Sequence, residues 1–196
     1  AGLLGELAPD VALPVPTERV DEDTWRKVTR GGLPSPALAI ADRPEVDAVA
    51  VAARPGRAPV VLLDHPTHLG NVGAVVRVAA AAGADAVLVT GRSDPWHPTA
   101  VRGGAGLQFA LPVGRVDGRP PPGRPLVAVD PAGEPLDHAA LPRDAVLAFG
   151  TERGGLSDDL LAAADATVSI PMQPGVSSLN LATAVAVVLY AGRSGG

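Results

Sequence analysis

The sequence contains no cysteine and few aromatic residues. Without cysteine the chain cannot form disulfides, cysteine-ligated zinc sites, iron–sulfur clusters or thiol nucleophiles, and the reducing cytoplasm is the expected compartment. Aromatic residues make up 3% of the 196 residues, so a globular core must be built from Ala, Val and Leu. No apolar run approaches the ~18 residues that span a bilayer, and no membrane association is expected.

Positive charge is scarce as well. The formal net charge is −5, whereas a protein that binds nucleic acid mainly through a broad basic surface usually carries a net positive charge. Of the 16 basic residues only Lys27 is a lysine. The predominance of arginine suits bidentate phosphate contacts, although a compositional bias of the genome explains it more simply.

The chain divides into two regions of different character. Residues 1–57 are rich in proline and charge, with one short helix expected near Glu22–Thr29 and one apolar run, Ala37–Ile40. This is too little apolar material to close a separate core. We interpret residues 1–57 as a fragment of a larger domain, or an arm, that leads through a linker at Arg54–Pro59 into a second domain of residues 58–196.

The second region alternates short apolar runs with helical segments. Strands are expected at Val60–Leu63, Ala86–Thr90, Leu126–Val129, Ala145–Phe149 and Ala166–Ile170, and helices at Gly73–Ala82, Pro135–Leu141, Ser157–Ala163 and Leu179–Tyr190. This order predicts an α/β fold with a mostly parallel sheet and helices on both faces. Ligands of such folds bind in loops at the carboxyl ends of strands, where three polar loops lie: Asp64–Asn71, Gly150–Gly155 and Pro171–Ser178.

Several common catalytic motifs are missing. There is no Walker A sequence, no G-x-G-x-x-G after the first strand and no G-x-S-x-G elbow, which disfavours phosphate-loop, dinucleotide and hydrolase sites. His65 and His68 are too few for a metal site, and His97 and His138 are isolated. No metal is therefore expected.

Each of the three loops carries polar side chains beside a helix or strand. Asn71 is expected at the N-cap of the first helix, and Arg77 about one turn in, on the face shared with Gly73. Glu152 directly follows a buried strand among glycines that allow a close approach of backbone to ligand. In the third loop Ser177 or Ser178 is expected to cap the last helix, with Asn180 at its start.

Together the loops resemble the three motifs of the SpoU/TrmH family of SPOUT-class RNA methyltransferases. Asn71–Arg77 matches N-x-G-x-x-x-R, Gly150–Leu156 matches G-x-E-x-x-G-[LM], and Ile170–Asn180 is similar to I-P-M followed by S-L-N. The order and spacing match over roughly residues 58–192. Pro174, Ala182 and Arg153 depart from the expected pattern without removing a matched polar position, and Tyr190 is followed by Ala191 where an acidic residue is usual.

The resemblance implies the function. It implies S-adenosylmethionine as methyl donor, a ribose 2′-hydroxyl of structured RNA as acceptor, a C-terminal trefoil knot and a homodimer with its active sites at the interface. The residues that match the family's cofactor-binding positions are Gly150, Ile170 and Leu179. Those that match its polar active-site positions are Arg77, Asn71, Glu152, Ser178 and Asn180.

The chemistry of the acceptor favours an electrostatic role for Arg77. A ribose hydroxyl is a weak nucleophile, so its proton must be removed or its developing charge stabilised. Arg77 suits charge stabilisation and phosphate binding, because a pKa above ~12 makes arginine a poor base.

Other readings remain open at this stage. One is a catalytically inactive relative that binds S-adenosylmethionine or RNA, another is a methyltransferase that acts on a small molecule or protein, and a third is a nicotinamide-dependent oxidoreductase. Thr29–Ile40 resembles the end of the RNA-recognition domain that many relatives carry before the linker. Because that domain is common in ribosomal RNA enzymes, rRNA is favoured slightly over tRNA.

Overall fold

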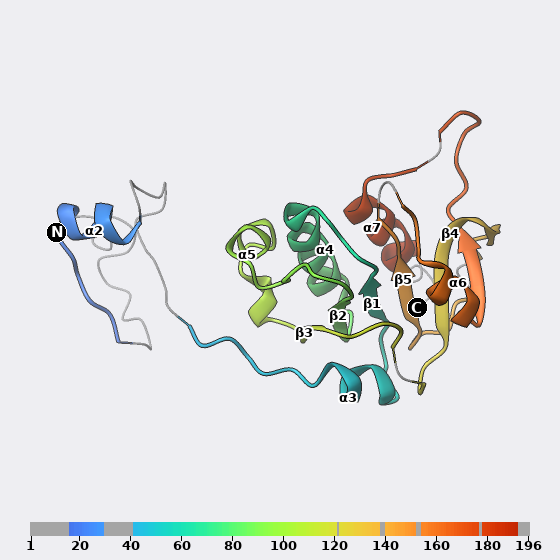
Figure 1. Cartoon of the computed structure of the whole chain (residues 1–196), viewed down its shortest axis with the longest axis horizontal. Helices are drawn as coiled ribbons and strands as arrows, with labels where there is room; N and C mark the ends of the chain where they lie inside the picture. Colours follow the sequence, from blue (N-terminus) through green and yellow to red (C-terminus); the bar gives the residue numbers. More distant parts are fainter. Residues whose placement is uncertain are drawn as a thin grey trace. The chain divides into compact units, whose positions relative to one another are not determined.

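The computed structural model describes residues 16–29, 41–120, 122–137, 140–151, 154–176 and 178–191. The chain forms two compact units, Ala1–Arg43 and Pro44–Gly196 (Figure 1). In the first unit, helix α2 (Glu22–Val28) confirms the short helix expected there. Its N-cap is Asp21, and the hydrogen bond from the Thr24 backbone N–H lowers the pKa of that carboxyl. The apolar run Ala37–Ile40 lies outside the described residues.

The second unit is built on a six-stranded sheet in which every strand pairing is parallel. The strand order is β3-β2-β1-β5-β4-β6. The strands are β1 (Val60–Leu63), β2 (Ala86–Val89), β3 (Val113–Arg115), β4 (Leu126–Pro135), β5 (Val146–Phe149) and β6 (Ala166–Ser169). The predicted parallel α/β fold is confirmed.

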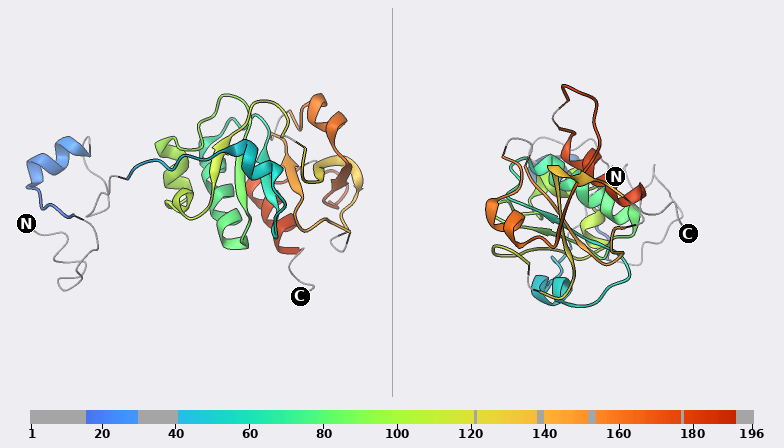
Figure 2. Two further views of the ribbon diagram at one scale, coloured as in Figure 1. Left: turned by 90° about the horizontal axis from the view of Figure 1, so that it is seen from below. Right: turned by 90° about the vertical axis from the view of Figure 1, so that its right-hand side faces the viewer.

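Helices cover both faces of this sheet. They are α3 (Ala48–Ala53), α4 (Leu69–Ala82), α5 (Pro98–Gly103), the 3-10 turn η1 (Leu107–Phe109), α6 (Asp158–Ala163) and α7 (Leu181–Ala191). One buried cluster joins the sheet to α4, α5 and α7, and a second joins the opposite face to α3 and α6. Figure 2 shows these two helical layers on either side of the strands.

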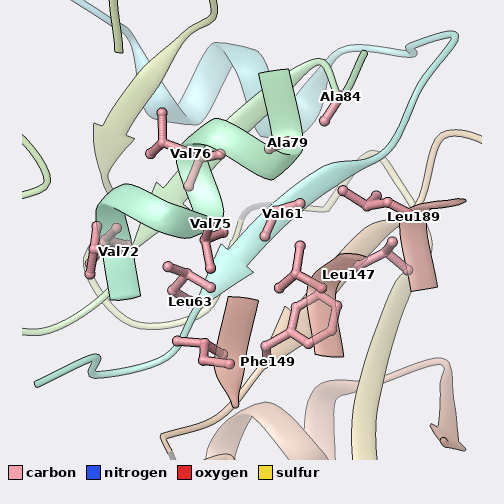
Figure 3. Packing of buried hydrophobic residues seen from close by; sticks show 14 of the residues in the cluster. Val61, Leu63, Val72, Val75, Val76, Ala79, Ala84, Leu147, Phe149 and Leu189 are labelled. Atoms are coloured by element: carbon pink, nitrogen blue, oxygen red, sulfur yellow. The ribbon is translucent and has the colours of Figure 1, made fainter. Parts of the chain in front are cut away.

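Strand β1 shows why the apolar runs form this sheet. Successive side chains of a strand point to opposite faces, so Val61 and Leu63 pack against Val75 of α4 (Figure 3). The alternate residues Val60 and Leu62 join the cluster with α3. All four residues of β1 are fully buried. A strand buried on both faces must be apolar throughout, which is the continuous pattern that the sequence shows.

Two expected helix positions are wrong. Helix α4 begins at Leu69 with His68 as its N-cap residue, so Asn71 lies inside the first turn instead of at the N-cap. Pro135, the expected start of a helix, is the last residue of β4 and pairs with Ser169 of β6. Leu136, Asp137, Ala140 and Leu141 are not helical. Long-range strand pairing overrides the local pattern there.

The buried Arg124 fastens the segment after α3 to the amino end of the sheet. Its guanidinium donates to the backbone oxygens of Arg54 (2.8 Å) and Ala58 (2.9 Å), and to Asp85 Oδ2 at 2.9 Å. Gly56 lies so close that a Cβ would meet Asp85 Oδ2 at 2.1 Å. Helix α3 lies within residues 1–57, and it packs on the sheet. The interpretation of residues 1–57 as the tail of a recognition domain stays a prediction.

Among the described residues no helix is long and apolar enough to cross a membrane.

The trefoil knot implied by the resemblance stays a prediction.

Candidate functional site at the carboxyl edge of the sheet

The carboxyl ends of β1, β5, β4 and β6 bring the polar loops to one edge of the sheet. Parallel neighbours end at the same edge, so the residues after each strand gather there even when they are far apart in sequence. Asp64 follows β1, Gly150 follows β5 and Ile170 follows β6. The three loops singled out in the sequence therefore share one site.

A cavity of about 310 Å³ opens among the last three of these strand ends. This volume is at the lower end of the range for small-molecule sites. It is lined by Val129, Asp130, Pro131, Phe149, Gly150, Thr151, Gly155, Ile170, Met172, Ser178, Leu179, Leu181 and Ala184. The three residues predicted to hold a cofactor, Gly150, Ile170 and Leu179, all line the cavity, as does Ser178.

The loop after β5 is folded too tightly for any side chain at its first position. Thr151 and Gly155 form an antiparallel bridge with N–H to O distances of 3.0 and 3.1 Å. A Cβ on Gly150 would lie 2.0 Å from the Gly155 carbonyl carbon, and Gly155 adopts a left-handed φ of 64°. Glycine at these positions leaves backbone groups exposed to a ligand. Glu152 lies outside the described residues.

The buried carboxylate of Asp64 connects three elements of this edge. Its Oδ1 accepts the Thr90 hydroxyl at 2.6 Å, and its Oδ2 accepts the Ser157 backbone N–H at 2.8 Å. The Thr90 hydroxyl oxygen in turn accepts the His65 backbone N–H at 2.9 Å. Asp64 therefore fixes the start of the first loop, the end of β2 and the end of the loop that carries Gly150.

Asn180 joins the third motif to the first. Its Oδ1 accepts the Ala182 N–H at 2.9 Å and the Thr183 N–H at 3.4 Å, so Asn180 caps α7. The expectation that Ser178 caps this helix is wrong, because Asn180 directly precedes the helix and its side chain accepts the free N–H groups of the first turn. Ser177 lies outside the described residues. The Asn180 Nδ2 group donates to Asn71 Oδ1 at 3.4 Å, which brings these two predicted site residues together.

Replacing Asn180 with Ala is expected to destabilise the protein by about 1 kcal/mol, because α7 loses its N-cap. For a chain of this size that is a fall in melting temperature of about 2–4 °C. Asn180→Asp is the matched control, since a carboxylate still accepts the Ala182 N–H but cannot donate to Asn71. Thermal melting of the three proteins measures the effect, and equal melting temperatures for wild type and N180A would contradict the capping role.

Arg77 lies on α4, the helix that also carries Asn71. It is exposed and, like Asn71 and Asn180, does not line the cavity. Gly73, one turn before it, is buried against α5, where a Cβ would meet the Ala100 carbonyl oxygen at 2.2 Å. The bond between Asn180 and Asn71 thus brings the first turn of α4 to the loop before α7, and Arg77 lies further along the same helix.

Sequence reasoning missed Asp130. This carboxylate lines the cavity directly after the buried part of β4. An acidic residue immediately after an apolar strand was the signal available, but the turn that orients it depends on the irregular pairing of β4 with β6. Met172 and Thr151, which belong to the matched motifs without an assigned role, also line the cavity.

Comparison with known proteins matches most of the second unit to one family. The model of the SpoU rRNA Methylase family matches residues 58–190. A 23S rRNA (uridine(2479)-2′-O)-methyltransferase of Streptomyces viridochromogenes is 37% identical over 66% of the chain. An uncharacterized tRNA/rRNA methyltransferase of Mycobacterium tuberculosis is 34% identical over 95% of this chain and 69% of its own length. The chain spans 50% of the Streptomyces relative's length.

Solved structures have the same fold. The SpoU methyltransferase AviRb of Streptomyces viridochromogenes, in complex with AdoMet, superposes with a TM-score of 0.64 at 35% identity, over 71% of this chain and 59% of that one. An AdoMet-bound rRNA methyltransferase of Sinorhizobium meliloti superposes with a TM-score of 0.70 at 27% identity, over 88% of this chain and 69% of that one. Both structures contain the cofactor that the three motifs imply.

Proposed function

The chain belongs to the SpoU rRNA methylase family, and on that premise we propose that it transfers a methyl group from S-adenosylmethionine to a ribose 2′-hydroxyl of structured RNA. One observation carries this proposal: residues of the second and third motifs, distant in sequence, line a single cavity at the carboxyl edge of the sheet. The named rRNA activity of the Streptomyces relative favours ribosomal RNA over transfer RNA as substrate.

The cavity fits the proposed cofactor. Its apolar lining, including Ile170, Met172 and Leu179, suits an adenine ring, and the glycines of the loop after β5 expose backbone hydrogen-bonding groups. Gly150, Ile170 and Leu179 would hold the cofactor, largely through these groups. When bound, S-adenosylmethionine supplies an electrophilic methyl carbon attached to a sulfonium.

The remaining task of the chain is to assist the acceptor hydroxyl. Its oxygen must bond to the methyl carbon as the carbon–sulfur bond breaks and the thioether leaves, while the hydroxyl proton passes to solvent. Negative charge therefore develops on the oxygen in the transition state. A guanidinium beside that oxygen stabilises the charge and binds the adjacent phosphate in a bidentate manner. We assign this role to Arg77, and the positioning of the ribose to Asn71, Ser178, Asn180 and Glu152.

We also propose a homodimer in which one copy supplies the cavity and the other supplies Arg77, which is exposed and is not among the residues that line the cavity of its own chain. Helix α7, which packs beside α4, exposes Val187 (37%) and Tyr190 (46%), and residues three apart share one helix face. Exposed apolar side chains on such a face are typical of a protein–protein contact.

We expect light scattering at micromolar concentration to give twice the mass of the chain. A monomer under these conditions would contradict a site shared between two copies.

Binding and transfer are tested in sequence. Calorimetric titration with S-adenosylhomocysteine is expected to show about one site per chain, and NADH to show none. Labelled S-adenosylmethionine is then supplied with rRNA or tRNA, and a 2′-O-methyl product is recognised because it resists alkaline hydrolysis at the modified ribose. Binding without transfer to either RNA would favour an inactive relative or a different acceptor, and binding of NADH would favour an oxidoreductase.

The proposed substrate also bears on location. Because ribosomal and transfer RNA function in the cytoplasm, we expect the chain to act there.

A further inference from the structure

Asp130 lies where strand β4 leaves the sheet. Val129 and Glu134 both pair with Val168 of β6, so residues 130–133 form an excursion between two paired segments. The Asp130 Oδ1 atom accepts the Ala132 N–H at 2.9 Å, which closes a turn of the Asx type and fixes the orientation of the carboxylate.

The carboxylate of Asp130 faces the cavity. It is the only charged side chain among the described residues that line the cavity. Its second oxygen, Oδ2, lies 3.8 Å from the position that a Cβ of Gly155 would occupy, so it faces the loop after β5. Most of the surrounding lining is apolar, and a carboxylate in such surroundings interacts strongly with hydrogen-bond donors of a ligand.

We propose that Asp130 recognises the ribose of the methyl donor, with Oδ2 accepting hydrogen bonds from the 2′- and 3′-hydroxyl groups. The inference rests on the proposed function and adds a specificity-determining residue outside the three motifs. A carboxylate suits this task because it is an acceptor only and the diol offers two donors. Acidic side chains after a strand bind the ribose of dinucleotides in other α/β folds by the same chemistry.

The positive sulfonium is the other cofactor group that the Asp130 carboxylate could bind. The chemistry of methyl transfer argues against this alternative. Methyl transfer removes the positive charge from sulfur, so a carboxylate beside the sulfonium would stabilise the ground state more than the transition state. The ribose hydroxyls keep the same charge throughout the reaction. Binding them lowers the KM for S-adenosylmethionine and leaves kcat unchanged.

Asp130→Asn tests the proposal with the turn preserved. The amide oxygen still accepts the Ala132 N–H, while Oδ2 becomes an NH₂ group that cannot accept a bond. We expect the affinity for S-adenosylhomocysteine in calorimetry to fall about tenfold, and the KM for S-adenosylmethionine to rise by a similar factor. The value of kcat should stay the same. Asp117→Asn, at an exposed carboxylate, is the matched control and should bind as wild type does.

A second arm uses a modified ligand on the unmodified protein. S-adenosylhomocysteine without its 2′- and 3′-hydroxyls should bind wild type about tenfold more weakly, and D130N with little further loss, because the two changes remove the same bonds. This arm tests the proposal even if D130N melts early.

Three results would overturn the assignment. The first is unchanged affinity of D130N for S-adenosylhomocysteine, and the second is equal affinity of wild type for S-adenosylhomocysteine with and without its ribose hydroxyls. The third is a loss of affinity in D130N that is much larger for S-adenosylmethionine than for S-adenosylhomocysteine, which would assign the carboxylate to the sulfonium. Failure of wild type to bind either cofactor form is a separate result, which would remove the proposed function itself.

Discussion

Replacing Arg77 with Ala is expected to lower kcat by about 10²–10³-fold while leaving the affinity for S-adenosylhomocysteine unchanged. The two effects separate because Arg77 is exposed on α4 and does not line the cavity. Loss of the guanidinium removes charge stabilisation from the ribose oxygen without touching the cofactor site. Calorimetry and single-turnover methyl transfer measure the two quantities independently.

Two variants serve as controls, one for the shape of the guanidinium and one for the loss of an exposed arginine elsewhere. Arg77→Lys keeps the charge but loses the planar guanidinium, so its rate should lie between those of wild type and R77A. Arg119→Ala removes an exposed arginine from a loop elsewhere and should keep the wild-type rate. Full turnover by R77A with normal binding of cofactor and RNA would refute the assignment of Arg77.

Mixing two inactive proteins tests whether Arg77 acts across a dimer. A Gly150→Val chain is expected to lose the cavity, because a Cβ there would meet the Gly155 backbone at 2.0 Å. If the subunits exchange, a mixture with R77A should regain about a quarter of the wild-type activity, since half of the dimers are mixed and one of their two sites is intact. No recovery, once subunit exchange is demonstrated, would place Arg77 and the cavity in the same chain.

Five of the six strands and the order of the motifs could be predicted because both are local in sequence, whereas β3 (Val113–Arg115) was not expected. A four-residue run such as Val60–Leu63 is apolar at every position, since both faces of the strand are covered, and that pattern requires no knowledge of its neighbours. The expected helix Gly73–Ala82 also ends where predicted, because Gly83 directly after it is the C-cap of α4, and its φ of 70° is the left-handed conformation that glycine adopts most easily.

Features that depend on distant parts of the chain could not be predicted. Pro135 pairs with Ser169 at the end of strand β4, where the sequence predicts a helix. The residues next to Pro135 give no signal of this pairing. The bond between Asp64 and Ser157 spans 93 positions in sequence. The side-chain geometry of the site, including the turn at Asp130, is therefore set by how the strand ends meet.

Replacing Asp64 with Leu is expected to destabilise the protein strongly. The carboxylate is 3% exposed and accepts hydrogen bonds from the Thr90 hydroxyl and the Ser157 N–H. Each bond to a charged group contributes about 1.5–3 kcal/mol, so losing both costs about 3–6 kcal/mol. The free energy of unfolding of a typical protein is only about 5–15 kcal/mol. The melting temperature of D64L should therefore fall by on the order of 10 °C.

Asp64→Asn separates the hydrogen bonds from the charge. The amide oxygen can still accept the Ser157 N–H, and the amide NH₂ can donate to the Thr90 hydroxyl oxygen, so D64N should lose only about 1–2 kcal/mol. Amide hydrogen exchange supplies a local measurement. In D64L the Ser157 N–H loses its hydrogen bond, so it should exchange much faster than in wild type. In D64N it should stay protected.

Cofactor affinity shows whether Asp64 also positions the site. Because Asp64 holds the end of the loop that contains Gly150 and Gly155, loosening the Ser157 contact should weaken binding of S-adenosylhomocysteine in D64L more than in D64N. The comparison is made well below the melting temperature of each protein, so that global unfolding does not contribute. Equal affinity in wild type and D64L, with Ser157 exchange accelerated, would mean that the cavity keeps its shape without this contact.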